Sequence, residues 1–389
     1  MAGKSLRHGE GRSNSSPFSF FTSGDASGKD KDSRTHTTAP ADISTSLSGG
    51  DYTNTPGDGY KYHTFITPGQ ILHPVSVTDT VCDILVIAGG GGGGAHYGAG
   101  GGAGGVALGI GITLTAQAGP FPVGVGTGGI GANREGSSDF FDAGVPGGNS
   151  HFGQPGTGIA GQPDYILAKG GGGGGGSYYS HPDGSGPGRP GGSAGGASGG
   201  DDPPADASAT QPGTNPSPFI TDYGSKGGWS TPTGGYAPSG GGGAGAAGAN
   251  IDGDEQGGGN GGTGITIPQF PHAKTGVAPL IPESYEFQLG GPTTFQQSGY
   301  AGGGGGSRYS AVADPDRNCL GGDGGGGFGS FSETGTGAGE KPTGLPNSST
   351  QGLDYTGSGG GGHKSTTNSG VSRQQNRGGH GVVIIRYQV

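Results

Sequence analysis

Apolar residues gather into short runs near the two ends of the chain. Residues 60–66 (YKYHTFI) alternate in character and stop at a Pro-Gly turn signal, which is typical of a strand. Residues 81–88 form a β-branched apolar run of strand length, and 106–114 and 121–125 add shorter candidates. The chain closes with 381–387 (GVVIIRY), another strong strand pattern. Because no segment shows a convincing 3.6-residue apolar period, we expect an all-β base with almost no α-helix.

Glycine dominates the chain between these strand patterns. Uninterrupted glycine runs lie at 89–94, 170–176, 240–243, 302–306 and 359–362. Their irregular spacing excludes collagen, which needs glycine at every third position. A flexible linker would not need strong strands at both of its ends. We therefore predict an extended N-terminal arm (1–50), a β-structured base (51–130 plus 380–389) in which the last strand lies beside 81–88, and a glycine-rich excursion (131–379).

The composition limits what kind of core the chain can build. Of its 389 residues, 103 are glycine and 28 are proline, whereas apolar residues make up only 27%. Globular domains are typically about 45–50% apolar, so one ordinary hydrophobic core cannot extend through the whole chain. The net charge of −10 is spread thinly and lacks the clustered Lys and Arg of a nucleic-acid-binding surface. No apolar stretch is long enough to span a bilayer, so we expect no membrane insertion.

Glycine runs become stable only when several of them pack together. Ordering each backbone residue costs roughly 1–2 kcal/mol, and glycine loses more freedom than any other residue. A single run should therefore stay disordered. Side by side, runs without Cβ atoms can approach closely as extended threefold helices, and every N–H and C=O can bond to a neighbouring run. We expect packed polyglycine type II helices, with the residues between runs forming loops at the ends of the bundle.

The ends of the glycine region resemble a known family. Asp83–Ala88 (DILVIA) is followed by six glycines, and 378–387 (GGHGVVIIRY) ends in a closing strand. Together with the segments at 100–106, 147–153 and 170–176, these residues resemble the glycine-rich domain of bacteriophage tail-fibre adhesins and related virion proteins, especially those of marine and cyanobacterial phages. The resemblance covers residues 60–389. It implies polyglycine helices that carry variable loops, and loops that touch receptors on a host surface.

The resemblance predicts a virion structural protein and not an enzyme. The expected role is that of a tail-fibre or tail-tip adhesin that contacts a host surface glycan or protein. A purely architectural virion component, such as a capsid decoration, neck or baseplate protein, is the alternative. A cellular glycine-rich wall protein is less favoured, because the N-terminus lacks the apolar core of a secretory signal. We therefore expect the protein in the virion.

Residues 1–50 form a polar arm without periodicity, apart from an apolar cluster at Pro17–Phe21. A segment of this kind becomes ordered only against a partner. We predict that the arm docks to another virion protein, within a homo-oligomer that we expect to be a trimer. A disordered tail without a role is the alternative.

Motifs for catalysis or cofactor binding are missing from the sequence. A strand followed by glycines at 82–105 imitates a dinucleotide-binding fingerprint, but the residues that follow will not hold the helix that this fold requires. The ten histidines lack zinc-ligand spacing. The carboxylates near Asp201 and Asp252 lack the full calcium-loop pattern. We therefore expect no enzyme activity, no cofactor and no metal.

Aromatic residues in 177–239, which we interpret as the longest loop, are the candidates for recognition. Tyr and Trp give large contact areas at low entropic cost. The candidate receptor-binding residues are Tyr178, Tyr179, His181, Tyr223, Trp229 and Tyr236. The low charge favours recognition by stacking and hydrogen bonds over ion pairs. Alternatively, these rings cap the ends of the glycine bundle and cover its backbone.

Overall fold

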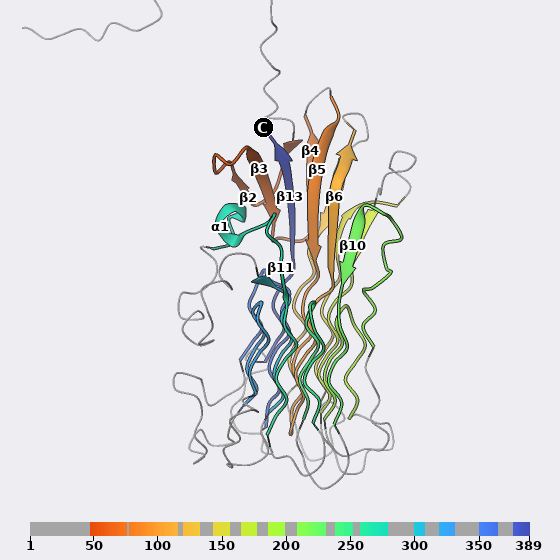
Figure 1. The fold of residues 1–389 in the computed structure, drawn as a ribbon, viewed down its shortest axis with the longest axis vertical. Coiled ribbons are helices and arrows are strands. Elements are labelled where there is room, and N and C mark those ends of the chain that lie inside the picture. The colour runs from red at the N-terminus through yellow and green to blue at the C-terminus, as the bar shows by residue number, and fades with distance from the viewer. Residues whose placement is uncertain are drawn as a thin grey trace, which may run out of the picture. The chain divides into compact units, whose positions relative to one another are not determined.

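The computed structural model describes residues 47–75, 78–115, 120–132, 143–155, 165–176, 186–198, 208–230, 238–251, 257–278, 299–307, 319–330, 350–364 and 376–389. The chain divides into two compact units, Met1–Ala41 and Asp42–Val389. The first unit lies outside the described residues, as does the predicted arm up to residue 46. Figure 1 shows the described elements of the second unit.

Antiparallel strands make up nearly all the regular structure of the described residues. The strands are β1 (Leu47–Ser48), β2 (Tyr52–Asn54), β3 (Tyr60–Phe65), β4 (Gln70–Pro74), β5 (Thr80–Ile87), β6 (Val106–Leu114), β7 (Phe121–Gly124), β8 (Ser150–Gly153), β9 (Tyr165–Ala168), β10 (Ile220–Tyr223), β11 (Ile265–Thr266), β12 (Gly299–Tyr300) and β13 (Val382–Gln388). One short helix is described, α1 (His272–Thr275). The prediction of a β-rich chain with almost no helix is confirmed.

The strands form three sheets. The six-stranded sheet has the order β10-β6-β5-β13-β3-β2, the five-stranded sheet has the order β1-β4-β7-β8-β9, and β11 pairs with β12. In the six-stranded sheet β13 lies antiparallel to β5, with Val382 opposite Ile87 and Tyr387 opposite Cys82. The predicted pairing of the last strand with residues 81–88 is confirmed. β13 also pairs with β3 on its other side, so it is an inner strand.

Three short strands from the glycine-rich excursion are members of the two large sheets. β8 and β9 extend the five-stranded sheet beyond β7, and β10 forms an edge beside β6. Each of these strands is four residues long. Such a short alternation does not stand out from a Gly- and Ser-rich background, which is why the sequence pattern did not predict these strands.

The two large sheets pack face to face around one apolar core. Ile84 of β5 and Ile385 of β13 share this core with Phe152 of β8. Leu85 and Ile87 of β5 point to the opposite face of the six-stranded sheet, where they pack with residues around α1 and β12. The second half of β5 is therefore buried on both faces, which explains why residues 84–87 are all apolar.

Candidate functional site

Glycine runs leave the strands of the two sheets and lie side by side on one side of them (Figure 1). Residues 88–94 continue β5, 99–105 lead back into β6, and 376–381 lead into β13. None of the residues in these three ranges belongs to a helix or a strand. Their backbone groups bond to several neighbouring runs instead of one partner strand.

The hydrogen bonds of residues 89–94 rotate among neighbours with a period of three residues. The donor and acceptor pairs are Gly89 to Gly148, Gly90 to Gly379, Gly91 to Gly102, Gly92 to Val145, Gly93 to Asn376 and Gly94 to Ala99, with N···O distances of 2.8 to 3.0 Å. Three segments thus accept bonds from this run. Its carbonyl groups accept bonds from three others, at 129–132, 171–174 and 360–363. The run 89–94 is therefore enclosed on all sides by backbone.

The returning run, 99–105, is enclosed in the same way. Its N–H groups donate to 169–175, 239–242 and 357–360, and its carbonyl groups accept from 88–94, 193–196 and Gly304. These two connected runs are inner members of the bundle, because neighbours surround each of them, and the run 301–306 is enclosed in the same way.

Close approach of the backbones requires glycine in the bundle. A Cβ atom on Gly91 would lie 2.2 Å from the carbonyl oxygen of Gly172, and one on Gly101 would lie 2.2 Å from that of Gly91. Both obstacles are backbone atoms, which cannot rotate away as a side chain can. Alanine fits at a few points, such as the fully buried Ala103. The interior of the bundle is therefore mainly main chain, and larger side chains belong at its ends or on its outside.

The runs end together on the side away from the sheets, which we call the distal end (Figure 1). Backbone hydrogen bonds tie these ends together, from Ala132 to Gly93, Ser198 to Gly186, Ile251 to Trp229, Ser307 to Gly98 and Ser330 to Gly362. Several segments that join the run ends lie outside the described residues, among them 133–142, 177–185, 231–237 and 365–375.

The turn Gly94–Gly98 connects the two inner runs at the distal end. Gly94 donates its N–H to Ala99 O at 2.9 Å and closes the turn. His96 and Tyr97 both have positive φ, 54° and 57°, and their ring centroids are 5.2 Å apart. Both side chains are partly exposed. This pair was not predicted from the sequence, although Ala-His-Tyr visibly interrupts the glycine-rich segment there.

Of the predicted recognition residues, the structure describes only Tyr223 and Trp229, and it places these two apart. Tyr178, Tyr179, His181 and Tyr236 lie outside the described residues. Tyr223 belongs to β10, opposite Val106 of β6. Trp229 lies at the other end of the run that follows β10, and its backbone N–H donates to Asn250 Oδ1 at 3.0 Å. The prediction of one long loop over 177–239 is wrong, because runs and a strand form wherever backbone partners are available.

Tyr223 lines a shallow groove at the sheet end of the bundle. The groove has a volume of about 380 Å³ and is lined by Leu108, Tyr223, Ile265, Thr266, Ile267, Pro268 and Gln269. Its lining is mainly aliphatic. Tyr223 is thus placed away from the distal end, where Trp229 and the turn Gly94–Gly98 lie.

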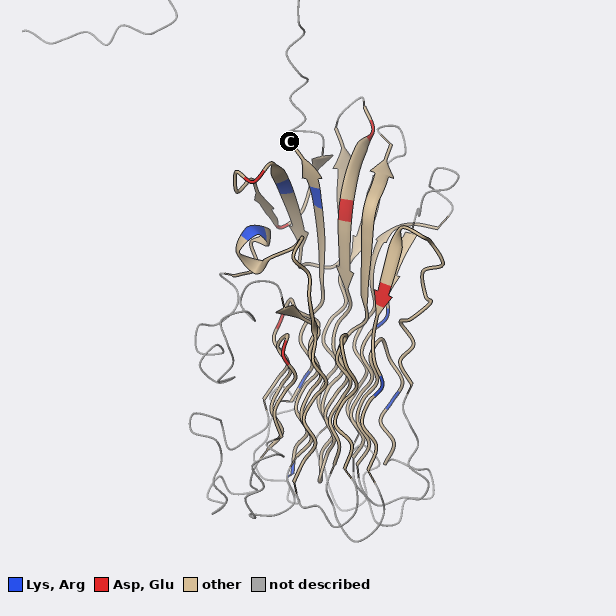
Figure 2. Cartoon of the chain, viewed as in Figure 1, with Lys and Arg blue, Asp and Glu red and all other residues tan. Residues whose placement is uncertain are grey.

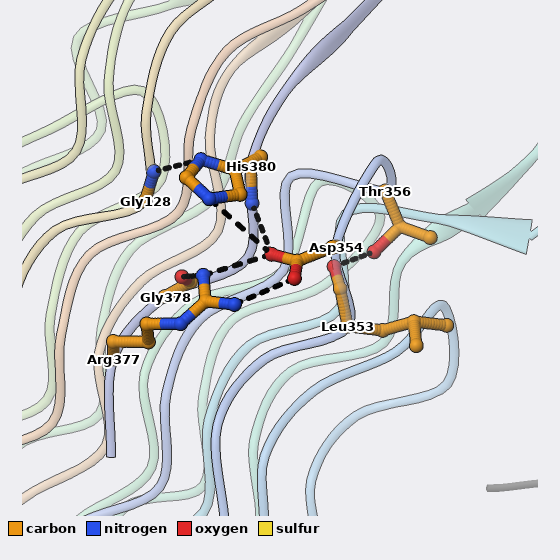
Figure 3. A network of polar contacts seen from close by, with 7 residues as sticks. All are labelled: Gly128, Leu353, Asp354, Thr356, Arg377, Gly378 and His380. Atoms are coloured by element: carbon orange, nitrogen blue, oxygen red, sulfur yellow. Dashed lines mark hydrogen bonds and ion pairs between the residues drawn. The ribbon is translucent and has the colours of Figure 1, made fainter. Parts of the chain in front are cut away.

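A polar network closes the sheet end of the bundle (Figure 3). Arg377 donates to both carboxylate oxygens of Asp354, at 2.8 and 2.5 Å. The backbone N–H of His380 donates to Asp354 at 3.0 Å, and the His380 ring accepts the N–H of Gly128 at 3.2 Å. Burial lowers the pKa of His380, and the hydrogen bond from Gly128 requires Nδ1 to be the ring nitrogen without a proton. The network holds the turn at Asp354 against the run that leads to β13, so its role is structural.

The described residues hold no group of three or more His, Cys, Asp or Glu side chains that is arranged to bind a metal ion. Within the same residues, no helix has the length and apolar character needed to cross a membrane.

A family model described as "Glycine-rich domain" matches residues 66–278, more than half of the chain. The chain belongs to this glycine-rich domain family. Runs beyond the matched residues bond to runs within them, as when Gly360 donates its N–H to Gly91 O at 2.9 Å. The bundle of the glycine-rich domain therefore continues past residue 278 toward β13. No curated protein matches the chain.

Proposed function

We propose that the chain is a virion structural protein, a tail-fibre or tail-tip adhesin that contacts a host cell surface. The sequence resemblance to phage adhesins supports the virion context. The structural support is that the described runs have a main-chain interior and end together at one end. The described runs offer few side chains for recognition, and their sheet end continues into the packed sheets, so we place the proposed contact at the distal end.

We also propose that the runs are polyglycine type II helices. A helix with three residues per turn rotates successive N–H groups by about 120°, so its donors reach three different neighbours in turn. The three-residue rotation of partners along 89–94 supports this proposal. Because the neighbours satisfy the backbone groups, such a bundle is stiff without a side-chain core. A stiff support that holds a contact surface away from its attachment point suits an adhesin.

The N-terminal arm supplies the proposed attachment. From the sequence alone, we propose that residues 1–50 dock to another virion protein and that the chain works as a homo-oligomer, with a trimer as the expected state. Deleting 1–50 should abolish incorporation into particles and leave the glycine-rich domain folded. Normal incorporation of the truncated chain would contradict this attachment.

Particle adsorption distinguishes an adhesin from an architectural component. In particles that carry Tyr178→Ala, Tyr179→Ala and Trp229→Ala together, we expect normal assembly and adsorption to host cells reduced roughly tenfold or more, because aromatic anchors dominate recognition energies. Tyr223→Ala is the matched control, since Tyr223 lies at the sheet end. If the triple variant assembles and adsorbs normally, these rings cap the bundle and the architectural role replaces the adhesin.

A further inference from the structure

We propose that copies of the chain associate side by side through the outer face of the five-stranded sheet and the two glycine runs that continue it, 125–132 and 143–149. We call this surface the lateral face. The inference rests on the homo-oligomer that forms part of the proposed function, and it adds the surface through which a second copy of the chain binds.

One face of the five-stranded sheet points away from the apolar core. Leu72 of β4, Phe121 of β7 and Ile166 of β9 belong to the core between the two large sheets. Side chains alternate between the two faces of a strand, so the neighbours of these residues point outward. None of the outward side chains is fully buried, and they include Ile71, Pro122, His151, Tyr165 and Leu167. The outer face of this sheet is therefore mainly apolar and aromatic.

The two glycine runs extend this face along the side of the bundle. The run 125–132 follows β7, and the run 143–149 precedes β8. Ile130 and Val145, one on each run, are both 47% exposed. The runs are hydrogen-bonded to each other, since Val145 donates its N–H to Ile130 O at 2.9 Å. Exposed aliphatic residues thus continue from the sheet onto the bundle, and contiguous exposed apolar surface marks sites of protein interaction.

The lateral face is built from segments without charged residues. None of the five strands contains Asp, Glu, Lys or Arg, and neither do the two runs. The six-stranded sheet, by contrast, includes Lys61, Asp83, Asp222 and Arg386, and two of its charged positions can be followed beside β13 and β5 in Figure 2. The cores of protein interfaces are depleted of charge. The equally uncharged face of a second copy is therefore a partner of matching chemistry.

Unpaired backbone groups on the run 125–132 also favour a second copy. Among the described residues, the N–H groups of Thr127 and Ile130 have no acceptor, and both residues are exposed. The carbonyl group of Gly128, which lies between them, has no donor there. A row of unpaired backbone groups is a template for pairing with another chain. Inside the bundle, donors three residues apart bond to one neighbouring glycine run, and a second copy supplies such a run.

This arrangement has a consequence for the proposed contact with a host. If the copies are related by a rotation axis along the runs, as in a closed ring, their distal ends lie at the same end of the oligomer. Several copies of the contact surface then face one host surface together, which raises the overall affinity without any new contact.

The test adds charge to the lateral face of the full chain. Ile71→Glu with Ile130→Glu places two carboxylates where the copies are expected to meet. The matched control is Ile110→Glu with Val81→Glu, which adds the same charge to exposed positions of the six-stranded sheet; Ile110 is 42% exposed, as is Ile71. We expect sedimentation equilibrium to show an oligomer for the wild type and the control. For the lateral variant the dissociation constant should rise at least roughly a hundredfold, while its circular dichroism spectrum stays that of the wild type.

Hydrogen exchange of the wild type gives a second measurement that needs no variant to fold. In a single chain the N–H groups of Thr127 and Ile130 are exposed and unbonded, so they exchange quickly. When the protein concentration is raised until the copies associate, exchange at these two amides should slow at least roughly tenfold. The segment 247–251, which is not part of the lateral face, should exchange at the same rate at both concentrations.

The outcomes separate this inference from the proposed function. Dissociation of the lateral variant alone, with slowed exchange at Thr127 and Ile130 in the wild type, supports the inference. Equal association of the wild type and the lateral variant overturns it, and dissociation on deletion of 1–46 would then assign the contact to the arm. Dissociation of both variants, or fast exchange at the two amides in the associated protein, also overturns it.

A wild type that stays monomeric at every concentration overturns both the lateral face and the homo-oligomer. The adhesin function is then still decided by adsorption of particles to host cells, which does not depend on association of the purified chain. Loss of adsorption in particles whose chains still associate would contradict the adhesin and leave the lateral face standing.

Discussion

Asp83 of β5 and Arg386 of β13 are directly opposite in the six-stranded sheet and form an ion pair, although they lie 303 positions apart in the chain. Arg386 donates from Nε and from a terminal nitrogen to the same oxygen, at 2.9 and 2.7 Å. The other oxygen of Asp83 accepts the N–H of Gly111 at 3.1 Å. Arg386 also lies over the ring of Tyr60, 4.3 Å from its centroid. The pair joins the strand that precedes the glycine bundle to the strand that follows it.

Removing this ion pair should lower the stability of the whole unit. The side chains of Arg386 and Asp83 are only 14% and 16% exposed, so each would be left largely desolvated without its partner. We expect Arg386→Met to lower the free energy of unfolding by about 2 kcal/mol, measured by urea denaturation. Lys274→Ala is the control, because Lys274 pairs with Asp58 at an exposed position and should cost much less. Equal losses of unfolding free energy in the two variants would contradict a stabilising role for the Asp83–Arg386 pair between β5 and β13.

Adding one methyl group should destabilise the protein more in an inner run than in a looser part of the bundle. Gly91→Ala would place Cβ 2.2 Å from a backbone oxygen, whereas Gly148→Ala would place it 3.0 Å from the nearest backbone atom. We expect Gly91→Ala to cost about 3 kcal/mol or more, and Gly148→Ala about 1 kcal/mol. Thermal or urea unfolding of the two variants provides the measurement. Similar, small losses in both would mean that the inner runs are not packed as closely as described.

Acid should destabilise the fold through buried histidine. Burial lowers the pKa of His272 to about 4, whereas a histidine in the unfolded chain titrates near 6.5. The unfolded chain therefore binds more protons between these values, and stability falls as the pH drops from about 6.5 to 4, by about 3 kcal/mol for one such residue. His363, whose pKa burial also lowers to about 4, adds to the effect. Urea denaturation at several pH values in this window measures the slope.

His272→Leu isolates the contribution of one histidine. In this variant the free energy of unfolding should depend less on pH between about 6.5 and 4, and the remaining dependence should come from His363. This expectation concerns the slope with pH and not the absolute stability of the variant. An unchanged slope would mean that His272 is not buried in its neutral form against Tyr300, whose ring lies 4.5 Å away.

The sequence predicted the parts of the fold that carry long apolar runs. β5, β6 and β13 were located because eight-, nine- and seven-residue strands leave a clear pattern. β8, β9 and β10 were missed because each is only four residues long, too short for an alternating pattern to stand out from a Gly- and Ser-rich background. Tyr223 was expected in a loop, yet its pairing with Val106 of β6 places it in the edge strand β10.

The distal turn shows a different limit of sequence reasoning. His96 stood among scattered histidines, and nothing in its neighbours indicates that 89–94 and 99–105 are inner runs. That fact emerges only from the hydrogen bonds to segments as distant as 360–363. Glycine runs carry no side-chain pattern, so their order in the bundle cannot be derived from composition or periodicity.

Amide hydrogen exchange tests the central claim that the glycine runs form an ordered, hydrogen-bonded bundle. We expect slow exchange for 89–94 and 99–105, roughly a thousandfold or more below the rate of an unfolded chain, because their N–H groups are bonded and buried. The outer segment 247–251 should exchange faster, since most of its residues are exposed. Fast exchange throughout 89–105, at the rate expected for a flexible chain, would contradict the bundle and every function derived from it.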